Sequence, residues 1–433
     1  MSQIGQSWGR WPRGEQEILA LPSRFESRLP AGPLLPFGNG RSYGDVCLNH
    51  GGRLLAARGM DRFIRFDPAT GVLECEAGVL LAEITQLVIG KGWFLPVTPG
   101  TSFVTVGGAI ANDVHGKNHH RVGSFGNHVL EFELQRSDGT VLHCAPNSHP
   151  EWFSATIGGL GLTGLVRTAK LQLRAVPGPW IRGDSQRFSN LAEFFALARD
   201  SDADYEYTVA WVDCSAKGPS MGRGVFMRGN HAPATQRPPS DRRLRVPFTP
   251  PISLINGASL KIFNQLYFHR GSAQMADALW HYRSFFYPLD GILEWNRIYG
   301  PQGFYQYQCV VPEDGAHESV GKMLRTIAEH GSGSFLAVLK LFGHKPSLGL
   351  MSFSRPGVTL ALDFPNRSTP TLALLESLDE VTRSSGGAVY PAKDARMSPE
   401  AFRQYFPNWQ RFRGFVDPQF TSSFWRRVME GTQ

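Results

Sequence analysis

The alternation of apolar and polar residues predicts an α+β organisation for the first part of the chain. Short strands are expected over residues 54–57, 71–79, 130–135 and 165–173. In the segments 71–79 and 130–135, apolar and polar residues alternate with a period of two. Residues 80–91 carry apolar side chains at helical spacing, and Gly92 is a suitable place for that helix to end. A glycine-rich turn over 158–164 leads into the last strand, and Pro-Gly-Pro at 177–179 predicts a boundary.

A different pattern follows the boundary. Strands are predicted over residues 207–213, 304–311, 334–342 and 358–364. A helix is predicted over 370–385, with Thr369 as its N-cap and Pro370 at its first position. Residues 228–251 are rich in proline and arginine, which predicts a mobile loop, and residues 253–268 are largely apolar. Together these two segments suit contact with a lipid or polyprenyl surface, and equally a solvated loop beside a core helix.

The composition limits the class of protein. A chain of 433 residues is longer than a domain with a single hydrophobic core usually is, so two domains are expected. A hydrophobic content of 42% is typical of a folded globule rather than a disordered chain. The formal charge of +7 suits an anionic ligand or an acidic membrane surface, and does not require a nucleic-acid partner.

Targeting and cysteine patterns predict a cytoplasmic protein. The sequence has no uninterrupted apolar run of about 18 residues, the length that a membrane span needs. Residues 1–10 lack the charged-then-apolar layout of a signal peptide. The cysteines are widely spaced and form no C-x-x-C pair, so we expect reduced, mostly buried thiols; they are Cys47, Cys75, Cys144, Cys214 and Cys309.

Two glycine-rich runs are the most informative feature of the sequence. Residues 36–45 read PFGNGRSYGD, and residues 105–120 read TVGGAIANDVHGKNHH. Glycine turns that follow apolar extended segments can bring bare backbone N–H groups against a phosphate. The glycines at 38, 40 and 44 do not have the spacing of a Rossmann fingerprint. The pair therefore predicts a dinucleotide held by loops of an α+β domain, as in a flavoenzyme.

The same runs offer two other interpretations. Residues 40–44 match the G-x-S-x-G elbow of serine hydrolases, but residues 45–52 are too rich in glycine and asparagine to begin the helix that the elbow requires. A plain surface turn also fits. His115, His119 and His120 with Asp113 suggest a metal site, yet the intervening glycine and asparagine disfavour a helix. We expect no metal, and a role for these histidines toward an anionic cofactor or phosphorylated substrate.

Polar residues inside apolar strands are further candidates for chemistry. Lys393 lies at the end of an apolar segment that predicts a buried strand, where it could stabilise the negative charge of a reduced isoalloxazine or pair with Asp394. Lys340 lies within another apolar strand, where a charge is costly unless it has an oppositely charged partner or a functional role. Gln306 and Gln308 point the same way by period two, which suits a sugar pocket or a solvent-exposed face.

Taken together, several motifs resemble the vanillyl-alcohol-oxidase-like FAD enzymes, and within them the decaprenylphosphoryl-β-D-ribose 2′-oxidase family. The matching strings lie at residues 38–45, 98–101, 105–120, 124–128, 294–297, 305–308, 340–343, 363–365 and 390–394, almost the whole length of the chain.

The resemblance implies a two-domain α+β fold of the PCMH-type FAD-binding class, with an inserted antiparallel-sheet substrate domain. The expected divisions are residues 1–177 for the first part of the FAD domain, 178–387 for the substrate domain and 388–433 for the segment that completes the FAD domain. The implied activity is oxidation of the ribose C2′ hydroxyl of a polyprenyl-phosphoryl sugar to a ketone, within cell-wall arabinan synthesis. An NAD(P)H-dependent short-chain reductase would complete the epimerisation to arabinose.

The resemblance also implies site residues. Cofactor positions are Phe37, Gly38, Asn39, Gly40, Arg41, Ser42, Tyr43, Gly44, Gly100, Thr105, Val106, Gly107, Gly108, Asn112, His115, Val166 and Tyr390. Catalytic positions are Lys393, His115, Lys340, Gln308 and Lys117, and substrate-wall positions are Trp211, Gln306, Thr359 and Ala361. Arg41 stands where related flavoenzymes often carry a flavin-linking histidine, so the FAD is expected to be non-covalent.

Three positions depart from the mycobacterial enzyme of this family. Ala361 replaces a cysteine, so inhibition that depends on that thiol is expected to fail. Thr359 replaces an asparagine, and Phe286 stands where a tyrosine is found. The lipid length and the sugar therefore stay open. The alternatives are an alditol or aldonolactone oxidase that produces hydrogen peroxide, and a non-catalytic flavin- or lipid-binding partner. We expect peripheral contact with the inner face of the membrane.

Overall fold

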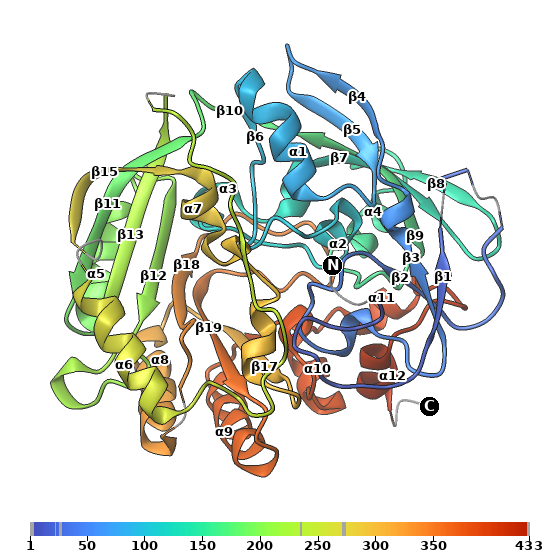
Figure 1. Cartoon of the computed structure of the whole chain (residues 1–433). Helices are drawn as coiled ribbons and strands as arrows, with labels where there is room; N and C mark the ends of the chain where they lie inside the picture. The colour runs from blue at the N-terminus through green and yellow to red at the C-terminus, as the bar shows by residue number, and fades with distance from the viewer. Residues whose placement is uncertain are drawn as a thin grey trace.

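The structure is a computed structural model that describes residues 4–21, 23–25, 28–233, 236–270, 274–331 and 333–430. Figure 1 shows two halves, with the N-terminal strands and the C-terminal helices on the right and a large sheet on the left. None of the helices in these ranges is long and apolar enough to span a bilayer. All five cysteines lie within the described ranges as free thiols, four of them buried.

The first half is built on two sheets. A parallel three-stranded sheet has the order β1 (Glu17–Ala20), β3 (Arg53–Ala56), β2 (Leu34–Phe37). An antiparallel five-stranded sheet has the order β4 (Phe63–Asp67), β5 (Val72–Glu76), β9 (Leu165–Gln172), β7 (Val129–Gln135), β8 (Val141–Cys144). The strands predicted here are confirmed, with shifted ends. A short pair joins β6 (Trp93–Phe94) to β10 (Arg174–Ala175).

Four short helices accompany these sheets: α1 (Leu81–Val88), α2 (Val106–Ala111), α3 (His119–Val122) and α4 (Pro150–Thr156). The predicted helix 80–91 is confirmed in its first two turns. Glu83 accepts a hydrogen bond from the Leu80 amide (2.7 Å) at the start of the helix. Its last residues tighten into a 3₁₀ turn, Ile89–Lys91, which ends at Gly92 in the left-handed conformation (φ 78°).

The second half is an antiparallel eight-stranded sheet. Its order is β15 (Met275–His281), β11 (Trp180–Phe188), β13 (Gly224–Ala232), β12 (Tyr207–Val212), β18 (Val338–Phe342), β19 (Gly357–Pro365), β17 (Phe304–Val311), β20 (Ala388–Val389). The helices α5 (Leu191–Ser201), α8 (Ala316–His330) and α9 (Thr369–Ser384) pack on one face. Val320, Met323 and Ile327 of α8 are fully buried at helical spacing. The opposite face is left for the site described below.

Three expectations in this half are wrong in detail. The segment 228–251 is not a loop throughout, because β13 runs to Ala232 and pairs with neighbours on both sides, which overrides its loop-like composition. Farther along the same segment, the short strand β14 (Leu244–Arg245) pairs in parallel with β16 (Ile292–Leu293). The strand expected over 334–342 begins only at Val338. Helix α9 has Ser368 at its N-cap, so Thr369 is its first residue and Pro370 its second.

The placement of Lys393 also differs from the prediction. Strand β20 ends at Val389, and Lys393 lies in a 3₁₀ turn, Pro391–Lys393. Pro391 has no N–H with which to continue the ladder, so the backbone turns away from the sheet.

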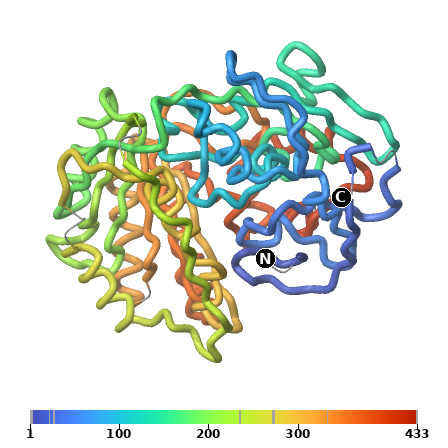
Figure 2. Tube along the Cα trace, turned by 45° about the horizontal axis from the view of Figure 1, so that its top comes forward, coloured from blue at the N-terminus to red at the C-terminus, as the bar shows by residue number. Residues whose placement is uncertain are grey.

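Further helices complete the fold. They are α6 (Gly257–His269), α7 (Tyr282–Phe286), α10 (Pro399–Tyr405), α11 (Trp409–Arg413) and α12 (Ser423–Met429). Figure 1 shows α11 and α12 below the N-terminal strands and α10 between α9 and α12, and Figure 2 shows the two ends of the chain in the same half. The domain boundaries at 177 and 387 stay predictions; β20 extends the large sheet, whereas α12 packs against the 3₁₀ turn Asp45–Cys47.

Arg427 of α12 fastens the C-terminal segment to the rest. Its guanidinium binds both oxygens of Asp45 (2.7 and 3.0 Å) and one oxygen of Asp394 (3.1 Å). Both carboxylates are almost fully buried. The arginine therefore joins the end of the first glycine loop to the segment that carries Lys393.

We predict that Arg427→Met lowers the free energy of unfolding by about 3–5 kcal/mol, because it leaves two buried carboxylates without their cation. Urea denaturation followed by tryptophan fluorescence measures the loss. The control is Arg411→Met, which removes an exposed ion pair with Glu151 (3.3 Å) and should cost no more than about 1 kcal/mol. Equal losses in the two variants would refute the tethering role.

Candidate active site

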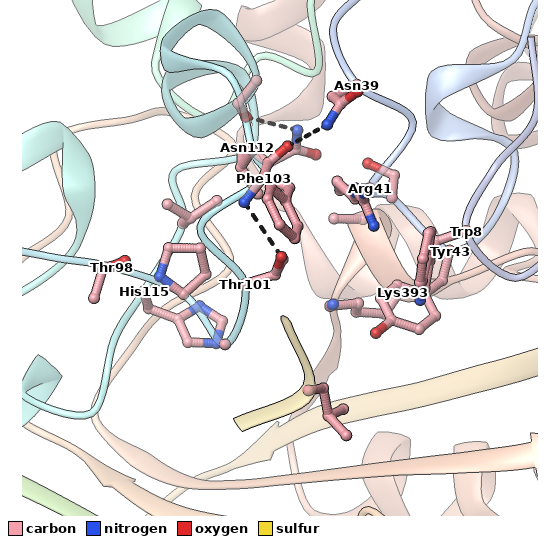
Figure 3. A pocket seen from close by; sticks show the side chains of 18 of the residues that line it. Trp8, Asn39, Arg41, Tyr43, Thr98, Thr101, Phe103, Asn112, His115 and Lys393 are labelled. Carbon is pink, nitrogen blue, oxygen red and sulfur yellow. Dashed lines mark hydrogen bonds between the residues drawn. The ribbon is translucent and has the colours of Figure 1, made fainter. Parts of the chain in front are cut away.

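A cavity of about 770 Å³ lies between the two halves of the molecule. This volume is within the range of pockets that hold cofactors and substrates, about 300–1,000 Å³. One wall consists of loops from the first half, including both glycine runs. The other wall is the uncovered face of the large sheet, with residues from β12, β17, β18 and β19. Figure 3 shows Arg41, Tyr43 and Lys393 on one side of this space and His115 and Thr98 on the other.

Two glycines allow the loops of the first wall to pack together. A Cβ on Gly38 would lie 2.4 Å from the Thr105 Oγ1, where the two glycine runs meet. A Cβ on Gly44 would lie 1.6 Å from the carbonyl oxygen of Asp394. Because neither space admits a side chain, glycine is required for these contacts. They bring the first loop against both the second loop and the segment 391–394.

The expectation that the glycine runs present bare backbone N–H groups is wrong for residues 106–108 of the second run. The Val106 and Gly107 amides donate to the carbonyls of Val79 (2.9 Å) and Ala77 (2.8 Å). The Gly108 amide donates to the Thr105 hydroxyl (3.1 Å), which caps α2. These three N–H groups are therefore not bare, because residues 106–111 form a helix with its own capping partners.

The serine-hydrolase interpretation lacks its structural context. Gly44 is followed by a single 3₁₀ turn, Asp45–Cys47, where a nucleophile elbow needs a helix.

Most of the expected cofactor residues line the cavity. They are Gly38, Asn39, Gly40, Arg41, Ser42, Tyr43, Gly100, Thr105, Gly107, Gly108, Asn112, His115, Val166 and Tyr390. Phe37, Gly44 and Val106 do not line it. Phe37 and Val106 are buried in the core on the far sides of their elements, and Gly44 packs on the Asp394 backbone.

Arg41 lies in an aromatic setting that the sequence did not predict. Its guanidinium carbon is 4.1 Å from the Trp8 ring centroid and 5.1 Å from that of Phe103. Asp290, which also lines the cavity, accepts hydrogen bonds from the Ser102 amide (2.8 Å) and hydroxyl (2.7 Å). Trp8, Phe103 and Asp290 come from distant segments, and no local pattern marks them as site residues.

Lys393 lines the cavity and is partly buried. Its ammonium lies 3.9 Å from the Tyr43 ring centroid. Burial lowers the pKa of Lys393 to about 7, while the negative charge of Asp363 acts in the opposite direction. Asp363 accepts a hydrogen bond from Gln306 (2.5 Å), and burial raises the pKa of this carboxyl. The sequence missed Asp363 as the electrostatic partner of Lys393.

The alternative pairing of Lys393 with its neighbour does not occur. Asp394 instead accepts hydrogen bonds from Arg427 and from the amides of Arg396 and Met397.

His115 is held as a neutral side chain. The Gln308 amide nitrogen lies 2.8 Å from its Nε2 and 3.1 Å from the Thr359 hydroxyl. Because an amide nitrogen can only donate, Nε2 accepts and the imidazole carries its proton on Nδ1. Burial, helped by the nearby charge of Lys340, lowers the pKa of His115 well below its usual value. His115 therefore adds no positive charge to the pocket and can act toward an anionic ligand only as a neutral hydrogen-bond donor.

Two further lysines reach the cavity. Lys117 donates to the Phe285 carbonyl and lies 4.6 Å from the centroid of that ring. Lys340 donates to the Gly116 carbonyl (3.4 Å). Burial lowers the pKa of Lys117 to about 7 and that of Lys340 to about 8. Unlike these lysines, His119 packs against Phe342 (4.4 Å between ring centroids) in the short helix α3 and does not line the cavity.

The sheet wall has the predicted polar face. Gln306 and Gln308 both line the cavity, which confirms their period-two orientation. Across the β17–β19 ladder they lie opposite Asp363 and Ala361, and Lys340 lies opposite Thr359 in β18–β19. Trp211 of β12 also lines the cavity, where its indole donates to the Phe335 carbonyl (2.8 Å).

Several buried polar atoms in the loop wall have no partner among the described residues. They are the Arg41 Nε, the Asn112 Oδ1 and the His115 Nδ1, all from residues that line the cavity. A buried polar group without a partner is costly, so such atoms indicate a polar ligand. An extended cavity with donors and acceptors spread along a loop wall fits a dinucleotide such as FAD.

Comparison with known proteins agrees with this geometry. Residues 26–145 match the model of a family described as an FAD binding domain. The chain is 37% identical over 408 residues to the decaprenylphosphoryl-beta-D-ribose oxidase of Mycolicibacterium smegmatis, covering 90% of this chain and 88% of that protein. It is 36% identical over 372 residues to an uncharacterized protein of Streptomyces coelicolor, covering 81% of this chain and all of that one.

A weaker match is to the L-gulonolactone oxidase of Mus musculus, 30% identical over 159 residues, which covers 36% of this chain and 34% of that enzyme. The match to the mycobacterial oxidase joins a named activity to nearly the full length of both chains. The resemblance drawn from the motifs is thereby confirmed, as are the α+β fold class, the FAD cofactor and the assignment as an oxidoreductase. The chain belongs to the decaprenylphosphoryl-β-D-ribose oxidase family of FAD enzymes.

Proposed function

We propose that this protein oxidises the C2′ hydroxyl of a polyprenyl-phosphoryl-β-D-ribose to the 2′-keto sugar with bound FAD. The observation that carries the proposal is the pairing of two unlike walls in one cavity. The loop wall offers unpartnered polar atoms to a dinucleotide, and the sheet wall offers amide and ammonium groups to a sugar phosphate. The position of oxidation follows from the family resemblance.

When bound, FAD supplies the acceptor for the hydride that leaves the sugar carbon. The cavity-lining residues of the two glycine runs, with Asn112, Val166 and Tyr390, would hold it. Lys393 would place a positive charge where negative charge develops on the ring system, and this preorganised charge needs no solvent rearrangement. Tyr43 beneath the ammonium and Asp363 beyond it help to keep Lys393 in its charged form.

The sheet wall, together with His115 and Lys117 of the second glycine run, would bind the sugar. Lys117 and Lys340, both partly buried, supply positive charge for the phosphoryl group. His115 would donate from Nδ1 to a sugar oxygen, with its ring oriented by Gln308. Trp211, Gln306, Thr359 and Ala361 would form the rest of the wall, and the lack of a thiol at position 361 predicts resistance to cysteine-directed inhibitors.

Two partners follow from this chemistry. A 2′-ketone must be reduced to complete an epimerisation, so an NAD(P)H-dependent short-chain reductase would act next. A polyprenyl tail is carried in lipid, so the enzyme would work in peripheral contact with a membrane, on its inner face. The peroxide-forming sugar oxidase is less supported, because the gulonolactone oxidase match covers only about a third of each chain.

The first prediction concerns the FAD linkage. Acid precipitation of the purified protein should release the flavin absorbance into the supernatant, because Arg41 cannot form the bond that a histidine makes at this position. Flavin retained in the pellet would disprove the non-covalent assignment. Protein that neither contains FAD nor takes it up on reconstitution would disprove the flavoenzyme.

The second prediction concerns Lys393. Lys393→Ala should retain FAD but lose about 10²–10³-fold in the rate of flavin reduction by substrate, because the developing charge loses its partner. Anaerobic stopped-flow absorbance measures this rate. Lys322→Ala, which removes an exposed lysine on α8, is the control and should behave as wild type. A wild-type rate in Lys393→Ala would make Lys393 structural only.

The third prediction concerns pH. The pKa of Lys393 is lowered to about 7, so its charged form dominates below that pH and is lost as pH rises through it. Flavin reduction should therefore slow as the pH increases through about 7. In Lys393→Arg the charge persists, and this decline should disappear even if the rate is lower at every pH. A decline that survives unchanged in Lys393→Arg would assign it to another group.

A further inference from the structure

Exposed apolar residues gather in one basic stretch of the chain. Residues 242–270 contain no aspartate or glutamate, but they do contain Arg242, Arg243, Arg245, Lys261 and Arg270. Six large apolar side chains here are 51–73% exposed: Leu244, Phe248, Ile252, Leu254, Ile262 and Leu266. Among the other described residues, only Ile4 and Phe25 have large apolar side chains exposed to this degree. Clustered exposed apolar surface of this kind indicates an interaction site.

Helix α6 presents part of this cluster on its outer face. Ala258, Ile262 and Leu266 form an exposed row at a spacing of four residues, and Lys261 lies in the adjacent exposed row. The inner face already holds the helix in place. There, Leu260 is buried, and the Asn264 amide donates to Asp213 (2.7 Å). The outer apolar row therefore makes no contribution to the fold.

The segment before α6 is fixed so that its apolar side chains face outward. Strand β14 pairs with β16, and Arg297 donates to the carbonyls of Val246 (3.1 Å) and Pro247 (2.7 Å). The Leu254 amide donates to the Ile298 carbonyl (2.9 Å). Figure 1 shows this segment crossing the front of the molecule between the two halves before it enters α6.

This surface is continuous with the cavity. Arg245, Tyr267 and Arg270 belong to it and also line the cavity. The Arg270 guanidinium lies 3.6 Å from the Tyr267 ring centroid, and that ring packs on Trp211 (4.6 Å) at the sheet wall. A ligand that spans the mouth of the cavity therefore passes along basic and aromatic side chains.

We propose that residues 242–270 form a docking surface for an anionic lipid bilayer. Its apolar side chains enter the boundary between headgroups and acyl chains, and its arginines and lysine bind the acidic headgroups. The proposal rests on the proposed function in one respect: the polyprenyl tail stays in the bilayer while the phosphoryl ribose reaches the cavity past Arg245 and Arg270. A second copy of the chain fits this surface poorly, because five basic residues face only Asp241, which pairs with Arg243 at the edge of the stretch (3.3 Å), so two such surfaces would repel each other.

The test is cosedimentation of the FAD-loaded protein with vesicles of phosphatidylcholine, with or without phosphatidylglycerol. We expect binding to the phosphatidylglycerol vesicles, weaker binding at high salt, and little binding to phosphatidylcholine alone. Ile262→Asp with Leu266→Asp should weaken binding by about tenfold or more, because it removes the inserting row and adds negative charge. Ile64→Asp with Leu372→Asp makes the same charge change at exposed apolar positions elsewhere and should bind as wild type.

Two readouts separate this proposal from the catalytic one. The flavin spectrum, and oxidation of a short-chain prenyl-phosphoryl ribose in detergent, should be the same in both double variants and the wild type. If oxidation is absent in all three while the binding pattern holds, docking stands and the proposed substrate is wrong. Failure of the wild type to bind anionic vesicles, or equal binding by the α6 variant, would overturn the proposal. So would a change in the sedimentation coefficient of the α6 variant without lipid, which would assign the surface to a second copy.

Discussion

The site depends on a backbone contact between segments from opposite ends of the chain. The Tyr43 amide donates to the Ala392 carbonyl (2.9 Å), and Gly44 packs so tightly on the Asp394 carbonyl that no side chain fits. This contact sets the Tyr43 ring beneath the Lys393 ammonium. Arg427 then neutralises the two carboxylates that the contact buries. The first glycine loop, Lys393 and the C-terminal helix are thus one structural unit.

Burial decides the electrostatics of the cavity. Three lysines line it, and burial lowers the pKa of each toward neutrality. His115 is neutral because its environment is buried and already positive. The charged forms of these lysines are therefore destabilised by burial, and a bound anion would stabilise them. A phosphoryl group and a flavin that gains negative charge on reduction both meet this condition. The positive charge of the lysines would therefore favour both substrate binding and flavin reduction.

The two walls differ because their backbones differ. The loop wall uses glycine contacts and side chains such as Asn112 and Arg41, whose Oδ1 and Nε atoms, respectively, have no protein partner among the described residues. The sheet wall uses alternation, which sends Gln306 and Gln308 to the cavity and Tyr305 and Tyr307 into the core on the other side. Trp211 and Tyr267 connect this wall to the proposed docking surface, so the sheet wall and the proposed lipid surface are neighbours in space.

The sequence alone determined the features that depend on local pattern and on motifs. Period-two alternation placed β17 and its two glutamines, and glycine spacing identified the two cofactor loops. Motifs along the whole chain identified the family, and with it most of the residues that line the cavity. Tertiary structure decided what local pattern cannot encode. It extended β13 through a loop-like composition, turned the chain at Pro391, and occupied the amides of residues 106–108. It also brought Trp8, Asp290 and Asp363 to the site. These outcomes depend on pairing, burial and close contact between distant segments, and the free energy of such contacts exists only once the chain has folded.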